Sequence, residues 1–365
     1  SYTSEMTVVT ASDIVLGGGL PSYTTVGSTV PVSLTWEKST TYDLGLDLDF
    51  LNNRLSFSGD YSRRYTTDMY TPSISLPSVY GTTSPKGNNA ELRTTGWELS
   101  LTWRDSFKLG GKPFDYSIKA MVWDNRTVVT KYENATRSLG TLKGYIQNGG
   151  SPSDFYEGME LGEMWGYTVA GLFRDQADID SSATHDFTQA SDKVTRPGQV
   201  KIADLDHNGN IDPGAFTADD HGDLSIIGNI NPHYMFGVNL AANWNGIGLS
   251  VFLQGVGARD WYPGSDAGMF WGKYGRPFFA LIPSIHNYTD DMYSAERNNW
   301  DTAYWPRMTT YQSNGTKNWT RLLEIPNTRY IQSAAYLRVK NIQLDYSFPK
   351  HICSAIRLQG LKIYV

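Results

Sequence analysis

Apolar and polar residues alternate along several stretches of the chain, which is the period-two pattern of β-strands. Over residues 42–50, leucine and aromatic side chains fall on one face and Asp43, Asp47 and Asp49 on the other. Asn245-Gly246 separates two such stretches, and this dipeptide suits the positive φ angles of a type I′ turn. The pattern predicts four strand pairs: 42–50 with 55–62, 97–104 with 114–122, 234–244 with 247–253, and 337–348 with a strand from 356 onward, after a turn near Lys350.

The connections alternate between short turns within these pairs and long loops between them. The long loops cover residues 63–95, 127–232 and 258–334. Structureless loops of this length are uncommon in compact soluble domains. Short turns on one side and long loops on the other are typical of a transmembrane antiparallel β-barrel, whose strands alternate lipid-facing and lumen-facing residues. A large soluble β-sandwich or lectin-like module stays open as the alternative.

Composition narrows the class of protein further. Aromatic residues make up 13% of the 365 residues, which excludes a disordered chain. No apolar stretch approaches the roughly 18 residues of a spanning helix, so a helical membrane protein is also excluded. The formal net charge of -6 argues against a nucleic-acid partner, which calls for a basic surplus. Cys353 is the single cysteine, so there is no disulfide framework.

Both ends of the sequence indicate that it continues. The chain begins at Ser1 rather than at a methionine, and residues 361–365 alternate like the middle of a strand. We therefore expect a piece of a longer protein, with material missing at both ends.

Segments from about residue 30 to the end resemble, in order and spacing, the SusC/RagA family of TonB-dependent outer-membrane transporters. The most specific of them is 252–263 (FLQGVGARDWYP). The other segments that carry the resemblance are 34–42 (LTWEKSTTY), 50–55 (FLNNRL), 84–88 (SPKGN), 95–99 (TGWEL), 156–158 (YEG), 161–167 (LGEMWGY), 204–212 (DLDHNGNID), 227–229 (IGN) and 336–344 (YLRVKNIQL).

The resemblance implies a multi-pass barrel of about 22 strands with a plugged lumen, in the outer membrane of a Gram-negative bacterium. It also implies an N-terminal plug domain that couples to TonB–ExbB–ExbD, and a SusD-like surface lipoprotein as partner. We interpret residues 1–365 as part of the barrel domain without the plug and the last strands, and residues 127–232 as an extracellular loop region. The implied function is import of oligomers, with glycan the first candidate cargo and peptide the second.

An Asp-rich segment, 204–223, resembles a calcium-binding loop. Hard oxygen ligands at alternating positions suit Ca²⁺, and Gly209 stands where an EF-hand loop needs its sharp turn. Ala215 occupies the position of the bidentate acid, so Asp219, Asp220 or Asp223 would have to fold back to replace it. An Asx-turn-rich loop without metal is the alternative. The candidate ligands are Asp204, Asp206, Asn208, Asn210 and Asp212.

Aromatic residues gather in the long loop after the segment that begins at Phe252. Aromatic rings near polar groups suit stacking on sugars, so these residues are candidate substrate contacts. The alternative, which we favour, is that the rings anchor the loop over the barrel mouth or touch the partner lipoprotein. The candidates are Trp261, Tyr262, Phe270, Trp271 and Tyr274.

No motif indicates catalysis. The six histidines lack the H-x-x-x-H spacing of zinc sites, and no G-x-S-x-G element is present. A glycosidase needs two carboxyl groups that flank the bond to be cleaved. Asp290-Asp291 is a pair of acids, but neighbouring acids are expected by chance among 37 acidic residues. We therefore predict no catalytic residue and no required cofactor. A soluble or surface-attached β-rich glycan-binding module is the alternative function; it explains the aromatic loops but not the alternating connections.

Overall fold

The computed structural model describes residues 6–10, 18–26, 34–72, 86–141, 144–145, 148–185, 195–263, 291–307 and 326–365. Its largest element is an antiparallel sheet of eight strands, in the spatial order β16-β15-β12-β11-β6-β5-β4-β3. The four predicted strand pairs are confirmed. The strands of the sheet are β3 (Lys38–Phe50), β4 (Leu55–Pro72), β5 (Lys86–Leu109), β6 (Lys112–Lys131), β11 (His233–Trp244), β12 (Ile247–Ala258), β15 (Tyr336–Ser347) and β16 (Lys362–Tyr364).

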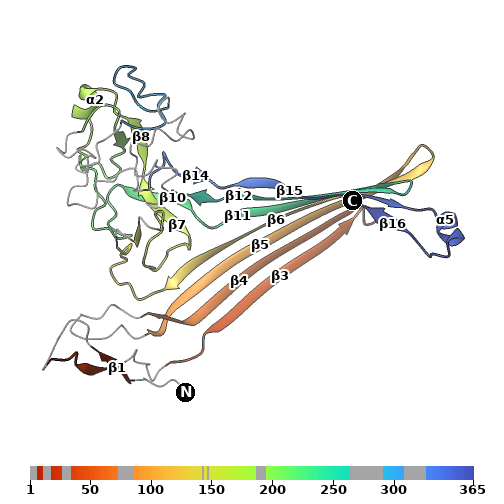
Figure 1. Ribbon diagram of the computed structural model, residues 1–365, viewed down its shortest axis with the longest axis horizontal. Helices are drawn as coiled ribbons and strands as arrows, with labels where there is room; N and C mark the ends of the chain where they lie inside the picture. Colours follow the sequence, from red (N-terminus) through yellow and green to blue (C-terminus); the bar gives the residue numbers. More distant parts are fainter. Residues whose placement is uncertain are drawn as a thin grey trace.

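Tight turns join strand pairs at one end of the sheet, far from the smaller strands β7, β8 and β10 (Figure 1). Asn245 and Gly246 have φ angles of 50° and 88°, the left-handed values of a type I′ turn. A Cβ atom at Gly246 would lie 2.7 Å from the carbonyl oxygen of Ser347, so this position requires glycine. The predicted turn at Asn245-Gly246 is therefore confirmed.

Two features of the strand boundaries correct the sequence-based prediction. β4 continues to Pro72 and β5 begins at Lys86, so the predicted loop over 63–95 is wrong for most of its length. The last connection contains the short helix α5 (Lys350–Ala355), and β16 begins at Lys362 rather than at 356. At the far ends of β4 and β5 the strict apolar alternation gives way to threonine, arginine and tyrosine. Hydrophobic periodicity cannot mark a boundary there.

The sheet has one apolar face, which continues across the strands through their register. Leu99 lies opposite Val122, and Ile118 lies opposite Leu240. Leu99, Ile118 and Leu240 are exposed, and Leu44 of β3 is 73% exposed. Soluble monomers rarely expose contiguous apolar patches above a few hundred Å², so this face suits hydrocarbon rather than water. Its exposed members include Leu44, Leu46, Leu48, Phe50, Leu99, Leu101, Ile118, Leu240, Leu249, Ile342 and Leu344.

The polar face carries the intervening residues of the same strands, among them Asp43, Asp47 and Asp60. β3 and β16 form the two edges of the sheet. Within the described residues neither edge pairs with a further strand, so the structure shows an open wall of eight strands. The predicted closed barrel of about 22 strands is thus not shown.

The buried core lies mainly outside the sheet, in a body formed by the long connections. We call this the loop body: the described residues of 132–232, 259–263, 291–307 and 326–335. Its elements are β7 (Glu163–Tyr167), β8 (Val169–Leu172), α2 (Gln176–Asp180), β9 (Val200–Ile202), β10 (Leu224–Asn229), β13 (Asp260–Trp261) and β14 (Gln332–Ser333). Fully buried side chains at its centre include Leu139, Tyr145, Met164, Tyr167 and Tyr330.

The loop body contacts the long strands at the end opposite the tight turns (Figure 1). Leu161 N donates to the carbonyl oxygen of Thr127, and Val129 N donates to that of Met159, which ties the loop body to β6. A separate hairpin, β1 (Met6–Thr10) with β2 (Ser22–Val26), lies near the N-terminus. None of the helices in the described residues has the length and apolar character needed to cross a membrane.

Candidate functional site

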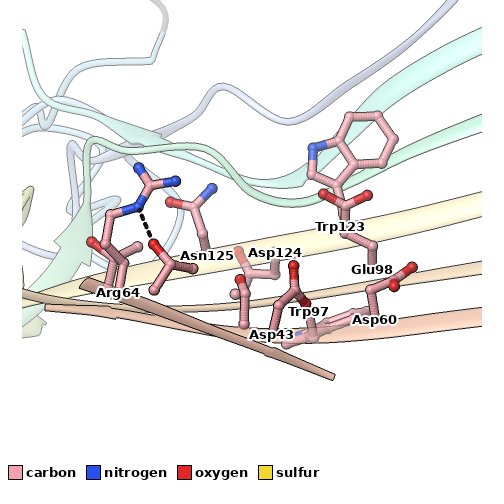
Figure 2. A pocket seen from close by; sticks show the side chains of 12 residues that line it. Asp43, Asp60, Arg64, Trp97, Glu98, Trp123, Asp124 and Asn125 are labelled. Atoms are coloured by element: carbon pink, nitrogen blue, oxygen red, sulfur yellow. Dashed lines mark hydrogen bonds between the residues drawn. The ribbon is translucent and has the colours of Figure 1, made fainter. Parts of the chain in front are cut away.

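The polar face of the sheet contains a hollow of about 460 Å³ across β3, β4, β5 and β6. Figure 2 shows Asp43, Glu98 and Trp123 on the same side of these strands. The lining residues are Thr41, Asp43, Asp60, Ser62, Arg64, Thr94, Gly96, Trp97, Glu98, Trp123, Asp124 and Asn125.

Strand register explains why these side chains meet. Asp60 of β4 lies opposite Glu98 of β5, and Glu98 lies opposite Trp123 of β6. Asp60 also lies opposite Gly45 of β3, where the absence of a side chain leaves room for its carboxylate. Because neighbours in register share one face of a sheet, three carboxylates and an indole ring are presented together.

The hollow is acidic, and three of its carboxylates have no partner in the described part of the chain. The carboxylates of Asp43, Asp60 and Glu98 form no hydrogen bond or ion pair with the residues that the structure describes. Arg64 is the one guanidinium of the lining, and its Nε donates to Thr41 Oγ1 at 3.3 Å. Free carboxylates beside an indole ring can accept hydrogen bonds from a hydroxyl-rich or cationic ligand while the ring stacks on it.

The Asp-rich segment forms a second candidate site, and the fold adds one residue to it. Asp204, Asp206 and Asp223 each offer a carboxylate oxygen within 4.8 Å of the others. Asp204 and Asp206 were predicted ligands, whereas Asp223 was one of three acids expected to reach the loop only if the chain folded back. The chain does fold back: Asp212 N donates to Asp223 Oδ2, and Leu205 N donates to Asp223 Oδ1.

Without a cation, the mutual repulsion and burial of these carboxylates are unfavourable in free energy. Asp223 is fully buried, and burial raises the pKa of its carboxyl, with Asp206 and Asp204 adding to the increase. The backbone N–H groups of Asp212 and Leu205 oppose this increase in pKa. Asp204 Oδ2 accepts from Gly209 N, whereas Asp204 Oδ1 is buried and has no hydrogen-bond partner in the described chain. An unpaired buried oxygen beside two other carboxylates matches the ligand chemistry of a hard cation.

Two other predicted metal ligands, Asn208 and Asp212, each direct a side-chain oxygen into the loop itself. Asn208 Oδ1 accepts from Asn210 N at 2.7 Å, and Asp212 Oδ1 accepts from Gly214 N at 2.7 Å. Asp212 is not among the three described carboxylates that converge. The structure thus brings together Asp204 and Asp206 of the predicted ligands and adds Asp223, which lies seventeen residues beyond Asp206.

The predicted aromatic contacts lie in different surroundings. Trp261, in β13, is 48% exposed. Tyr262 is 3% exposed, and its hydroxyl accepts from Asn327 Nδ2 at 2.8 Å inside the loop body. Phe270, Trp271 and Tyr274 lie outside the described residues. Trp261 is thus partly exposed at the surface of the loop body, whereas Tyr262 contributes to the packing of the loop body.

Comparison with known proteins identifies the family. The family described as "TonB dependent receptor-like, beta-barrel" matches residues 10–219, more than half of the chain. The chain belongs to this family. Barrels of TonB-dependent receptors lie in the outer membrane, which agrees with the exposed apolar face of the sheet.

Curated relatives are TonB-dependent receptors as well. TonB-dependent receptor P3 of Formosa agariphila is 25% identical over 334 residues, which cover 91% of this chain and 29% of the relative. TonB-dependent receptor SusC of Bacteroides thetaiotaomicron is 28% identical over 186 residues, which cover 50% of this chain and 16% of SusC. This TonB-dependent receptor chain therefore spans less than a third of the length of these relatives.

Solved structures show the same fold at low identity. The RagAB peptide transporter matches with a TM-score of 0.61 and 17% identity, covering 100% of this chain and 34% of the solved one. The RagAB peptide importer in its "open-open" state matches equally well, with a TM-score of 0.61. At this identity the likeness supports the fold of the receptor chain and nothing finer.

Sequence reasoning missed the hollow on the polar face. Alternation assigns Asp43, Asp60 and Glu98 to one face of their own strands, but it does not say which residues lie opposite one another. Register depends on turn geometry and on bulges such as the one between Thr66 and Met69 of β4. A signal was present in the turn at Asn52-Asn53, which sets the register of β3 against β4.

Proposed function

We propose that this receptor chain is part of the wall of an outer-membrane nutrient importer of SusC type. The observation that carries the proposal is the eight-strand sheet, apolar on its exposed face and acidic on the other, in a chain of the TonB-dependent receptor family. Lipid offers no partner to backbone amides, so a spanning sheet must pair all of its strands. The complete importer would then hold about 22 strands around a plug.

The proposed partners follow from the relatives. SusC and the RagAB neighbours support a surface lipoprotein of SusD type over the loop body, and the family name supports energy coupling through TonB–ExbB–ExbD. In this arrangement the loop body faces outward and the tight turns face the periplasm. The protein acts as a transporter, with substrate captured between the lipoprotein and the loops.

Glycan oligomers are the first candidate cargo, and peptide oligomers are the second. The exposed ring of Trp261 and the hollow around Trp123 and Glu98 suit hydroxyl-rich ligands, because carboxylates accept hydrogen bonds and indole rings stack. The RagAB structures are described as those of a peptide transporter, which supports the second candidate. Phe270, Trp271 and Tyr274 stay predicted substrate contacts.

Ligand capture by the intact receptor tests both cargo classes. The receptor is purified with its co-purifying lipoprotein, bound oligomers are identified by mass spectrometry, and binding is measured by calorimetry with glycan and peptide pools. Trp261→Ala is expected to weaken binding about tenfold, since one aromatic stacking contact contributes about 1–1.5 kcal/mol. Trp36→Ala is the matched control, because Trp36 is 81% exposed and lies just before β3. No binding of either pool would contradict the importer proposal.

The alternative, a soluble or surface-attached glycan-binding module, predicts a different behaviour on extraction. A barrel wall requires detergent, because its apolar face cannot be dissolved in water as a monomer. A lectin-like module is released by salt or by mild washing. Solubility of the intact protein in detergent-free buffer as a monodisperse monomer would favour the alternative.

We also propose that Asp204, Asp206 and Asp223 hold Ca²⁺ in the loop body. The proposal is supported by their converging carboxylates and by the buried, unpaired Asp204 Oδ1. Calcium takes six to eight oxygen ligands, so carbonyl groups of the loop and water would complete the shell. The ion would join residues 204–212 to the segment that carries Asp223 and would fix the orientation of the loop.

Thermal unfolding of the intact receptor tests the calcium proposal. Saturating Ca²⁺ at a hundred times its Kd is expected to stabilise the loop body by about 2.7 kcal/mol over the same sample in chelator. Asp206→Asn is expected to abolish the difference, whereas Asp301→Asn, an exposed acid outside the group, keeps it. Equal unfolding with and without Ca²⁺ in the unmodified receptor would contradict the proposal and favour a metal-free loop.

A further inference from the structure

A buried histidine joins the barrel wall to the loop body. His233 is the first residue of β11 and is 6% exposed. Its Nδ1 lies 2.7 Å from Asp124 Oδ1 of β6, and Asp124 is also buried. Its Nε2 lies 3.5 Å from Oε1 of Glu160, which belongs to the loop body just before β7. One imidazole thus lies between a carboxylate of the wall and a carboxylate of the loop body.

The geometry distinguishes the two protonation states of the imidazole. The short contact to Asp124 places a proton on Nδ1. A neutral ring in this tautomer presents a lone pair at Nε2, so two acceptors would face each other across the contact with Glu160. Nε2 has no hydrogen-bond partner among the described residues. A second proton at Nε2 turns this contact into an attraction between opposite charges.

The sum of the charges around His233 also differs between the two protonation states of the imidazole. Arg126 of β6 lies 3.8 Å from Asp124 and 3.6 Å from Glu160, measured from guanidinium nitrogen to carboxylate oxygen. Two carboxylates therefore share one guanidinium when the imidazole is neutral, and the group is balanced when the imidazole is charged. The other groups at this site are two uncharged donors, Tyr234 N on Asp124 and Asn229 Nδ2 on Glu160, and the side chain of Tyr234. Its ring centroid lies 6.4 Å from that of His233, and its phenol lies beside Arg126. Asp260 accepts from Asn229 N and so faces the group only indirectly.

We propose that His233 is a pH-sensitive latch between the barrel wall and the loop body. Its imidazolium attracts both Asp124 and Glu160, and loss of the proton from Nε2 removes this attraction on Glu160 while Arg126 and Asn229 stay in contact with it. Histidine is suited to this role because its ordinary titration range lies between pH 5 and 8. The latch is closed when the imidazole carries both protons and opens when Nε2 loses its proton. It does not depend on which cargo the receptor carries.

Backbone hydrogen bonds around Glu160 report the state of the latch. Leu161 N donates to the carbonyl oxygen of Thr127, and Ile230 N donates to that of Gly162, both at 2.8 Å. The Leu161 bond joins the loop body to β6, and the Ile230 bond lies within the loop body three residues before β11, so both amides are expected to exchange with solvent more readily when the latch opens. Amides of β4 and β5 within the sheet carry none of the latch residues and serve as an internal reference.

Hydrogen exchange of the intact receptor in lipid nanodiscs, at pH 5.5 and 8.5, tests the proposal. After correction for the intrinsic exchange rate, protection at Leu161 and Ile230 is expected to fall about tenfold between the two pH values, the factor for one hydrogen bond to a charged group. His233→Gln is expected to show the low protection at both pH values. Glu160→Gln is expected to remove the pH dependence as well.

The control is His207→Gln, since His207 is exposed in the Asp-rich loop and makes no contact with this group. This variant keeps the pH dependence of the unmodified receptor. Unchanged protection of β4 and β5 in every variant shows that the wall is folded. The proposal is overturned if the unmodified receptor shows no pH dependence at Leu161 and Ile230, or if folded His233→Gln retains it.

Discussion

The sheet and the loop body use the same apolar residue types in opposite ways. Leu44 of β3 is 73% exposed, whereas Leu139 of the loop body is fully buried. Burying a leucine side chain gains about 1.5–3 kcal/mol over leaving it in water, so a whole exposed face would be untenable in water. The difference fits two regions that fold against different solvents: the loop body excludes water from a core, and the proposed barrel wall has its apolar face in lipid.

Polar groups also differ between the loop body and the sheet in whether they have hydrogen-bond partners. In the loop body the buried carboxylate of Glu163 accepts from Tyr156 Oη, from Trp165 Nε1 at 2.9 Å and from Glu160 N at 3.1 Å. The pKa of the Tyr156 hydroxyl is raised, first by burial and then by Glu163. On the sheet, Asp60 and Glu98 remain free on the polar face within the described chain. Buried polar groups need partners, whereas polar groups that face a water-filled lumen do not.

Truncation of the loop-body core gives the largest expected effect. Leu139→Ala is expected to destabilise the loop body by about 2–5 kcal/mol, because it leaves a cavity that neighbouring side chains cannot fill. Hydrogen exchange of the loop body in the intact receptor measures this free energy. Leu205→Ala, at an exposed leucine of the same body, is the matched control and should change it by less than about 0.5 kcal/mol. Equal effects would remove the distinction between core and surface.

A charge on the apolar face gives the next largest effect. Leu46→Arg is expected to cost about 2–4 kcal/mol in phospholipid vesicles if residue 46 lies near the bilayer midplane. Ser100→Arg, on the polar face of β5, is the control and should cost much less. Denaturant titration of the refolded receptor measures both. If the two variants were equally stable, the apolar face would not be in lipid.

Replacement of a turn glycine gives a smaller effect that is confined to the sheet. Gly246→Ala is expected to cost about 1–2 kcal/mol, because alanine is strained at a φ angle of 88° and its Cβ would meet the carbonyl oxygen of Ser347. The same denaturant titration detects this loss. Gly360→Ala is the control, since nothing lies within 4 Å of its Cβ position and its φ is not positive. A neutral Gly246→Ala would argue against the type I′ turn.

The smallest expected effect is a pH dependence on the loop-body surface. The N–H of Arg174 and the ammonium of Lys201 lower the pKa of Asp178, so its contribution to stability is present at neutral pH. It is lost as the pH falls below about 4, the usual range of this carboxyl. The loss is expected to be below about 1 kcal/mol because the pair is partly exposed. Asp178→Asn should remove this increment of acid sensitivity of α2 in hydrogen exchange; an unchanged pH profile would contradict it.

The sheet could be predicted from sequence because one face of each strand is uniformly apolar. Residues 42–50 alternate without exception, and the turn at Asn245-Gly246 carries its own conformational signal. The sequence resemblance to the SusC/RagA family supplied the rest of the predicted architecture, since segments such as 252–263 occur in a specific order along the chain. The strand extensions to Pro72 and from Lys86 could not be predicted, because threonine, arginine and tyrosine there give no period-two contrast.

The candidate sites were predicted only where their residues are close in sequence. Asp204 and Asp206 are two residues apart and were found, whereas the convergence of Asp223 depends on a fold-back that local spacing does not encode. The pairing of His233 with Asp124 spans 109 positions and depends on the neighbouring strands β6 and β11. Tyr262 had the residue type of a ligand contact, but its burial is decided by the packing of the loop body.

Spin labels at neighbouring residues of β3 test the central claim most directly. Single cysteines are placed at Leu46 and at Asp47 in a Cys353→Ser background, and the labelled receptor is reconstituted in lipid vesicles. The account predicts that the label at residue 46 collides with oxygen dissolved in the bilayer and is shielded from a water-soluble nickel complex, whereas the label at residue 47 shows the opposite preference. Access of the nickel complex to both labels would contradict a lipid-facing wall.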